Sequence, residues 1–226
     1  KAVVFTFENH AWERFLIKKI KSNNKNVKTF AYQFTTISKD QYTKYSKKDY
    51  DPHFVLSSGS KIHVFLKKVF KNKSKVINFG SYRQQKIIPK KKNYFNKKFL
   101  LVPEAPLTEA NDFINIGINL AKRYKDCEFT LRLHPMSKSK ELTDKIKNKT
   151  KNLKNFTYSS KTLDQDLYDN CYMIHRASSL SITAALSGLL PIYLSDNNYN
   201  LDPMFLINKK YILKSNEDLK KILIFP

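Results

Sequence analysis

Short apolar runs alternate with longer amphipathic segments along almost the whole chain, and this alternation is the strongest constraint on its fold. Residues 2–7 are β-branched and aromatic, which predicts a strand. Residues 11–21 carry Trp12, Phe15 and Leu16 at helical spacing. Strands and helices in alternation predict βαβ units and parallel sheets. We therefore predict an α/β fold of GT-B-like type, with two Rossmann-like domains.

A basic stretch at residues 81–98, with Pro89 and a run of lysines, interrupts this pattern and predicts an interdomain linker. We expect a partial acceptor-side domain over residues 1–95 and a nucleotide-binding domain over residues 96–226, meeting at a cleft. The chain starts at Lys1 on a buried-looking strand. Only about three predicted strands precede the linker, where a Rossmann-like domain has about six. We therefore expect the N-terminal domain to be incomplete.

The charge balance narrows the choice of partner. The 226 residues include 42 Lys and Arg against 19 Asp and Glu, a formal net charge of +23. Such an excess is typical of proteins that bind nucleic acid or anionic membranes. Nearly all of the basic residues are Lys, however, whereas base-reading surfaces favour Arg. We therefore expect a solvated Lys surface first, attachment to anionic lipid second, and nucleic acid least of all.

Cysteine usage and hydropathy indicate the compartment. Cys127 and Cys171 lie in apolar runs without metal-ligand spacing, which is typical of buried thiols in a reducing compartment. No apolar run approaches the ~18 residues of a membrane span, and no signal peptide is evident. We therefore expect a cytoplasmic protein, with peripheral attachment to the inner face of the plasma membrane as an option. The histidines show no metal-ligand spacing, and we expect neither a metal nor another cofactor.

Two polar segments follow predicted strands of the second domain. His134 and Pro135, with Arg132 before them, come after a strand at residues 128–133. Proline ends that strand and leaves the histidine at the carboxyl edge of the sheet, where open α/β sheets bind ligands. A strand end without a functional role is the alternative interpretation.

The second polar segment contains Arg176, Ser178 and Ser179 and follows a predicted strand at residues 172–175. Serine is a preferred helix N-cap, and free amides and hydroxyls at a helix N-terminus favour phosphate. A capped helix without a ligand is the alternative here. Because both segments follow parallel strands of one sheet, we expect them at the same edge.

A His-Pro dipeptide followed further along by a Ser-Ser pair resembles the motif pair of bacterial sialyltransferases and Kdo transferases, which are GT-B enzymes that use CMP-activated sugars. The resemblance to surface-carbohydrate glycosyltransferases extends to other segments. On the acceptor side these segments are Glu8-Asn9-His10-Ala11-Trp12-Glu13-Arg14 and Gly80-Ser81-Tyr82-Arg83. At the start of the donor-binding domain they are Pro103-Glu104-Ala105 and Glu109.

The resemblance implies roles around the donor nucleotide. It implies that His134 contacts the CMP phosphate or ribose and that Ser178 and Ser179 bind the phosphate. The further residues that it implies at the donor site are Arg132, Pro135, Arg176, Glu104 and Arg83, although a solvated linker position is equally compatible with Arg83. In many GT-B enzymes that use other nucleotides, a Glu in this last helix binds the ribose. Here those positions hold residues 182–184, Ile-Thr-Ala, which favours a CMP-sugar over a UDP- or GDP-sugar.

An inverting transferase also needs a general base near the acceptor hydroxyl. Glu8 ends the first predicted strand and is the preferred base. Glu13, about one and a half turns into the next helix, is the second catalytic candidate. Compensation of the helix dipole is the structural alternative for both. Trp12 is expected in the core.

Together these observations predict an inverting, metal-independent glycosyltransferase. The expected donor is a CMP-activated nonulosonate or Kdo-like acid, and the expected acceptor is a cell-surface glycan or lipid-linked glycan of lipopolysaccharide or capsule synthesis. One alternative is a CDP-glycerol-type glycerophosphotransferase of teichoic-acid-like polymer synthesis, which shares the fold and both motifs. The other is a non-catalytic fragment that binds a sugar nucleotide.

Overall fold

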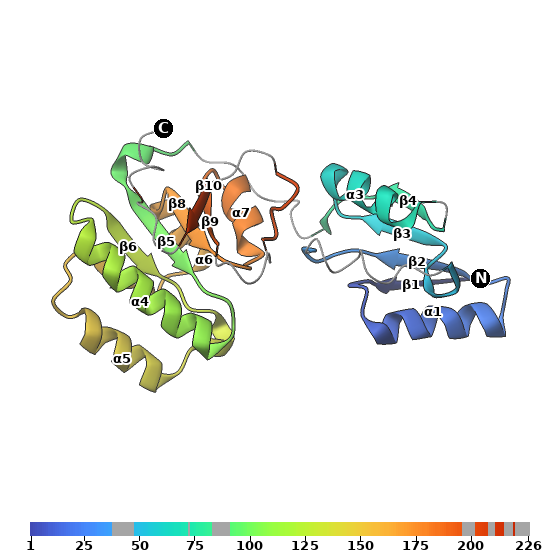
Figure 1. The fold of residues 1–226 in the computed structure, drawn as a ribbon, viewed down its shortest axis with the longest axis horizontal. Helices are drawn as coiled ribbons and strands as arrows, with labels where there is room; N and C mark the ends of the chain where they lie inside the picture. The colour runs from blue at the N-terminus through green and yellow to red at the C-terminus, as the bar shows by residue number, and fades with distance from the viewer. Residues whose placement is uncertain are drawn as a thin grey trace. The chain divides into compact units, whose positions relative to one another are not determined.

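Two parallel sheets organise the chain. A computed structural model describes residues 1–37, 48–71, 73–82, 91–195, 202–207, 211–214 and 219. Contacts divide the chain into two compact units, Lys1–Lys86 and Ile87–Pro226, each with its own sheet (Figure 1). The predicted α/β class with two Rossmann-like parts is confirmed. In the described part of the chain, no helix is long and apolar enough to cross a bilayer.

The first unit has a four-stranded sheet in the order β1-β2-β3-β4, and every neighbouring pair is parallel. Its core side chains come from the sheet and from one face of each helix, and include Phe7, Ile17, Val55 and Leu66. The elements are β1 (Ala2–Thr6), α1 (Ala11–Asn23), β2 (Lys28–Tyr32), the 3-10 turn η1 (Lys48–Tyr50), β3 (Phe54–Ser57), α3 (Ser60–Phe70) and β4 (Lys75–Asn78).

The second unit has a six-stranded parallel sheet in the order β10-β9-β8-β5-β6-β7. Its strands are β5 (Lys98–Val102), β6 (Glu128–Leu131), β7 (Phe156–Tyr158), β8 (Tyr172–His175), β9 (Leu190–Ser195) and β10 (Tyr211–Lys214). Its helices are α4 (Leu107–Arg123), α5 (Lys140–Thr150), α6 (Leu163–Asp169) and α7 (Leu180–Leu186), with the 3-10 turns η3 (Tyr94–Asn96) and η4 (Pro135–Ser137).

The central strands of this sheet are buried on both faces, which explains their continuous apolar sequences. Successive side chains of β5 point to opposite faces. Phe99 and Leu101 join a cluster with α4 and α5. Leu100 and Val102 join a second cluster with α6 and α7. The sheet is thus the middle layer between two layers of helices. Because its faces are covered, a ligand can reach the sheet only at the ends of its strands.

The observed boundary between the units precedes the predicted one at residues 95 and 96. Tyr94 of η3 belongs to the second unit: its hydroxyl donates to the Gly188 carbonyl at 2.8 Å, and its carbonyl accepts from the Tyr172 hydroxyl at 3.1 Å. The Cys171 thiol lies 3.1 Å from the Asn93 carbonyl. Residues that the composition assigned to a linker are therefore packed against β8 and the end of α7.

Trp12 is not in the core, contrary to the prediction. Its side chain is 61% exposed, and Phe15 beside it is 57% exposed. The buried residues of α1 are instead Glu13, Arg14 and Ile17. Helical spacing predicted the helix correctly but not its orientation, because the inner face of α1 is largely polar.

Gly117 permits close packing of α4 on the sheet and yields a stability prediction. A Cβ atom at this position would lie 2.5 Å from Phe156 Cε2 and 3.3 Å from Leu101 Cδ2. Ala usually stabilises a helix interior by about 1 kcal/mol relative to Gly. Here we expect Gly117→Ala to lower the free energy of unfolding by about 1–3 kcal/mol, because the core must shift to admit the methyl group.

Urea unfolding followed by circular dichroism measures this effect. Asn119→Ala, at an exposed position of the same helix, is the matched control and should be neutral or slightly stabilising. Equal or greater stability of the Gly117→Ala protein would show that the contact with Phe156 is not restrictive.

Candidate functional site

The strand order of the second unit reverses between β5 and β8. From β5 the chain moves outward through β6 to β7, and it then returns to β8 and moves the other way through β9 to β10. Open α/β sheets bind ligands outside the carboxyl ends of their strands at such a reversal. The loops at this point are residues 103–106 after β5 and residues 176–179 after β8. They mark the candidate site.

The loop after β5 and the first turn of α4 bring two carboxylates, Glu104 and Glu109, to this edge. The Glu104 amide donates to Glu109 Oε1 at 3.2 Å, which ties the loop to the first turn of α4. Burial raises the pKa of Glu109 above the ordinary Glu value. The Glu104 amide and the charge of Arg176 act in the opposite direction, because both favour the carboxylate form.

Arg176 supplies a cation from the loop after β8. Its Nη1 lies 3.6 Å from Asp112 Oδ2, and its guanidinium carbon lies 5.7 Å from the centre of the Phe113 ring. Both partners belong to α4, so the guanidinium is held beside the helix that follows β5. The side chain is largely buried, with 17% exposed. A partly desolvated Arg at a sheet edge is well suited to a phosphate or carboxylate.

His134 lies in the next loop along, after β6. Its Nδ1 accepts from the Met136 amide at 3.2 Å, so the neutral ring carries its proton on Nε2, which can donate to a ligand. Pro135 begins η4. The Ser137 hydroxyl donates to the Ala105 carbonyl at 2.6 Å and ties this loop to the loop after β5. The structure thus brings the loops of His134, Glu104 and Arg176 to one sheet edge.

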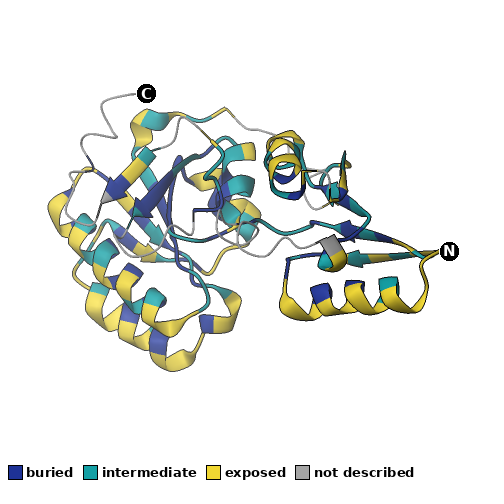
Figure 2. Cartoon of the chain, turned by 45° about the vertical axis from the view of Figure 1, so that its right-hand side comes forward, coloured by how far each residue is buried: buried dark blue, intermediate teal, exposed yellow. Residues whose placement is uncertain are grey.

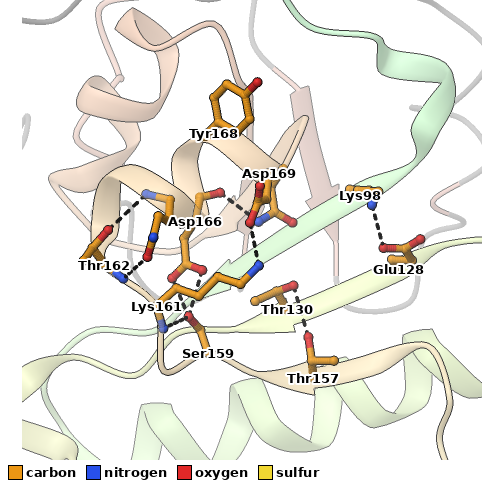
Figure 3. A network of polar contacts seen from close by, with 12 residues as sticks. Lys98, Glu128, Thr130, Thr157, Ser159, Lys161, Thr162, Asp166, Tyr168 and Asp169 are labelled. Atoms are coloured by element: carbon orange, nitrogen blue, oxygen red, sulfur yellow. Dashed lines mark hydrogen bonds and ion pairs between the residues drawn. The ribbon is translucent and has the colours of Figure 1, made fainter.

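Arg132 has a structural partner. Its Nη1 donates to Asp166 Oδ2 at 2.6 Å and to the Lys161 carbonyl at 2.9 Å. Asp166 is buried and also accepts from the Ser159 hydroxyl at 2.6 and 2.8 Å (Figure 3). Sequence reasoning missed Asp166 and Ser159, because no local pattern predicts that Arg132 pairs with an Asp 34 residues further along the chain. A donor-binding role for Arg132 would have to coexist with this ion pair, and it stays a prediction.

The chain contains two Asp-x-Asp sequences, Asp49-Tyr50-Asp51 and Asp164-Gln165-Asp166. In each of them the second Asp forms an ion pair with an Arg of its own unit. Asp51 is buried and lies 3.0 Å from Arg14 Nη2. Asp166 pairs with Arg132. Among the described residues, no group of three or more His, Cys, Asp or Glu side chains could hold a metal ion.

The two serines after β8 differ in accessibility. Ser178 is buried, and its hydroxyl accepts from the Leu180 amide at 3.4 Å. Ser179 is exposed and makes no side-chain cap on α7. The predicted serine-capped helix is therefore shorter and differently capped, because Ser178 satisfies its own turn. Ser179 is the serine whose hydroxyl is accessible to a ligand.

Glu8 and Glu13, the two candidates for the general base, differ in their surroundings. Glu13 is buried and accepts from the Glu8 amide at 3.0 and 3.1 Å and from the His10 amide at 2.7 Å. It therefore caps α1, which is the structural alternative considered above. The Glu8 carboxylate is 30% exposed, with Oε2 3.1 Å from His10 Nε2. Glu8 stays the predicted general base. Arg83 lies outside the described residues.

A buried His and a buried Asp were missed altogether. His175, at the end of β8, and Asp202 line a cavity of about 70 Å³ together with Tyr193 and Tyr211. The His175 ring lies 5.9 Å from that of Tyr193. The available signal was a titratable residue at the end of an otherwise apolar strand, directly before Arg176.

Comparison with known proteins identifies the fold. No protein-family model and no curated protein matches the sequence. Solved structures do. TarM has 14% identity and a TM-score of 0.53, over 99% of this chain and 46% of TarM. The pneumococcal O-GlcNAc transferase GtfA, in complex with UDP and GlcNAc, has 11% identity and a TM-score of 0.54, over 91% of this chain and 45% of GtfA.

A third structure, the glycotransferase of kitacinnamycin, has 10% identity and a TM-score of 0.56, over 97% of this chain and 65% of that protein. The fold is that of GT-B glycosyltransferases. The chain spans about half the length of TarM and of GtfA. At these identities, the likeness shows the fold alone.

The capping contacts of Glu13 give a prediction that separates it from Glu8. Glu13→Ala removes the acceptor for two partly buried backbone amides, so we expect a loss of about 1–3 kcal/mol in the free energy of unfolding of the first unit. Urea unfolding followed by circular dichroism and by Trp12 fluorescence measures it. Glu8→Ala, at a carboxylate that is 30% exposed, should have the smaller effect, below about 0.5 kcal/mol. Equal effects of both substitutions would contradict the capping assignment.

Proposed function

We propose that this chain carries the nucleotide-binding part, and some of the acceptor part, of an inverting glycosyltransferase. The observation that carries the proposal is the reversal of strand order between β5 and β8, with Arg176 and the Glu104–Glu109 loop at that point. The GT-B fold of the solved structures supports it.

The proposed donor is a CMP-activated sugar. A single phosphate needs few hydrogen-bond donors, and this edge offers the Arg176 guanidinium, His134 Nε2 and the Ser179 hydroxyl. Ile182, Thr183 and Ala184 of α7 provide no carboxylate for a ribose, which supports CMP over UDP. UDP is the rival nucleotide, because the similar GtfA structure contains it.

The proposed reaction is a single displacement. Glu8 accepts the proton of an acceptor hydroxyl as that oxygen forms a bond to the anomeric carbon of the sugar. The bond from this carbon to the phosphate oxygen breaks, and the nucleotide leaves with the electron pair. Arg176 and His134 stabilise the negative charge that develops on the phosphate. The proposed step uses no metal, because these two donors stabilise the leaving phosphate.

The proposed acceptor is a cell-surface glycan or its lipid-linked precursor. Such acceptors are presented at membranes, and the excess of Lys supports attachment to an anionic bilayer from the cytoplasmic side. Each Lys near such a surface contributes about 1 kcal/mol, so a few lysines suffice for reversible binding.

Calorimetry with CMP, CDP, UDP and GDP side by side tests the donor assignment. We expect CMP to bind, and His134→Ala and Arg176→Ala each to weaken its binding about tenfold or more, because each removes a hydrogen bond to a charged group. Ser179→Ala should have a smaller effect of the same sign. The control is Glu128→Gln. Glu128 is the first residue of β6, so this substitution lies at the amino ends of the strands, away from the proposed site at their carboxyl ends.

The outcomes separate the alternatives. Tighter binding of UDP than of CMP would refute the donor while leaving glycosyl transfer in place. A preference for CDP would favour a glycerophosphotransferase. Wild-type affinity in the His134→Ala and Arg176→Ala proteins would show that the nucleotide binds elsewhere.

A further inference from the structure

Helix α1 carries its large apolar side chains on the outside of the first unit. Trp12, Phe15 and Leu16 are 61%, 57% and 37% exposed. Their spacing places them on one face of the helix, and we call them the outer stripe. Figure 2 shows α1 exposed over most of its surface, with buried residues only in short bands.

The inner face of α1 does not need this stripe, because a polar network attaches the helix to its unit. Arg14 Nη1 donates to Asn9 Oδ1 at 2.6 Å, and Nη2 lies 3.0 Å from Asp51 Oδ1. Glu13 caps the helix, and Ile17 supplies a buried apolar contact. Three large apolar side chains grouped on one exposed face, and not scattered singly, are typical of an interaction surface.

The exposed charged residues of α1 itself are all basic, although Asp49 of the neighbouring turn η1 is also exposed and interacts with Lys18. Lys19 Nζ lies 5.5 Å from the centre of the Phe15 ring, and Lys18, one residue earlier, is also exposed. Lys25 and Lys28 are exposed beyond the C-terminal end of the helix. The single acidic residue of α1, Glu13, is buried in its capping contacts. The outer surface of α1 therefore combines aromatic residues with positive charge.

We propose that α1 docks along the surface of an anionic lipid bilayer, with Trp12, Phe15 and Leu16 in the headgroup region. Amphipathic helices with Trp and Phe on one side and Lys beside them lie in this way in the membrane interface. A second copy of the chain fits the surface poorly, because a two-fold contact would bring the lysines of both copies together. Anionic lipid satisfies the apolar stripe and the charges at once.

Docking through α1 assigns membrane attachment to one helix. The attachment proposed above relies on the Lys-rich surface as a whole. This inference rests on that attachment and does not depend on which nucleotide binds. Because Trp12 is the only tryptophan of the chain, its fluorescence reports directly on entry of the outer stripe into lipid.

The test is binding of the full chain to vesicles, with matched variants. Wild type should bind phosphatidylglycerol-containing vesicles, with a blue shift of Trp12 emission, and should bind phosphatidylcholine vesicles weakly. Phe15→Ser and Lys19→Glu should each weaken binding about tenfold or more. The controls are Phe95→Ser, at an exposed Phe of the second unit, and Lys68→Glu, at an exposed Lys of α3.

The controls make the same chemical changes elsewhere, and Lys68→Glu changes the net charge as much as Lys19→Glu does. They should stay within about twofold of wild type. A loss with Lys68→Glu equal to that with Lys19→Glu would overturn the proposal, and so would Trp12 emission that does not change on bound vesicles. Sedimentation as a dimer that Phe15→Ser dissociates would assign the stripe to a second copy. Calorimetry with CMP on the same proteins shows separately whether the donor site works.

Discussion

The pairing of β5 with β8 is the contact on which the candidate site depends. These strands are distant in sequence, but their register aligns Val102 with His175. The loops that begin with Pro103 and Arg176 therefore leave the sheet side by side. Because β5 and β8 are buried on both faces, apolar packing stabilises their pairing, and the loops beyond them are free to carry polar groups. This register therefore places the loops of Glu104 and Arg176 next to each other at the carboxyl ends of the strands.

Buried Arg–Asp pairs support the loops in each unit. Arg14 pairs with Asp51 in the first, and Arg132 pairs with Asp166 in the second. Burying such a pair costs desolvation free energy, and removing one partner leaves an uncompensated charge. Arg132 directly follows β6, whereas Arg14 lies in α1, the helix that follows β1. In each unit an ion pair thus anchors a segment that follows a strand.

The pairing in the first unit also determines what α1 exposes. Arg14 and Glu13 occupy its inner face through contacts with backbone and with Asn9 and Asp51. An amphipathic helix normally turns its apolar side inward. Here polar contacts occupy much of the inner side, so Trp12 and Phe15 face outward. One network therefore stabilises the unit and creates the surface that we assign to lipid.

Much of the fold was predictable from periodicity, and the departures have local causes. The strands at β6 and β8 and the helix at α1 were expected close to their observed positions, because short apolar runs, the helical spacing of Trp12 and Phe15, and Pro135 mark them. The orientation of α1 was not predictable, since its polar contacts come from Asp51, far along the chain. The buried hydroxyl of Ser178 depends on a turn conformation, and the partner of Arg132 depends on tertiary structure. Sequence placed His134 and Arg176 after their strands but did not show the pairing of β5 with β8 that unites them.

Amide hydrogen exchange with and without CMP tests most directly whether the β5–β8 edge binds a nucleotide. Our account predicts slower exchange on adding CMP in the loops at residues 103–106 and 176–179, and around His134, with no change at residues 124–128 near the amino end of β6. Protection confined to other segments, or no protection at saturating CMP, would contradict it.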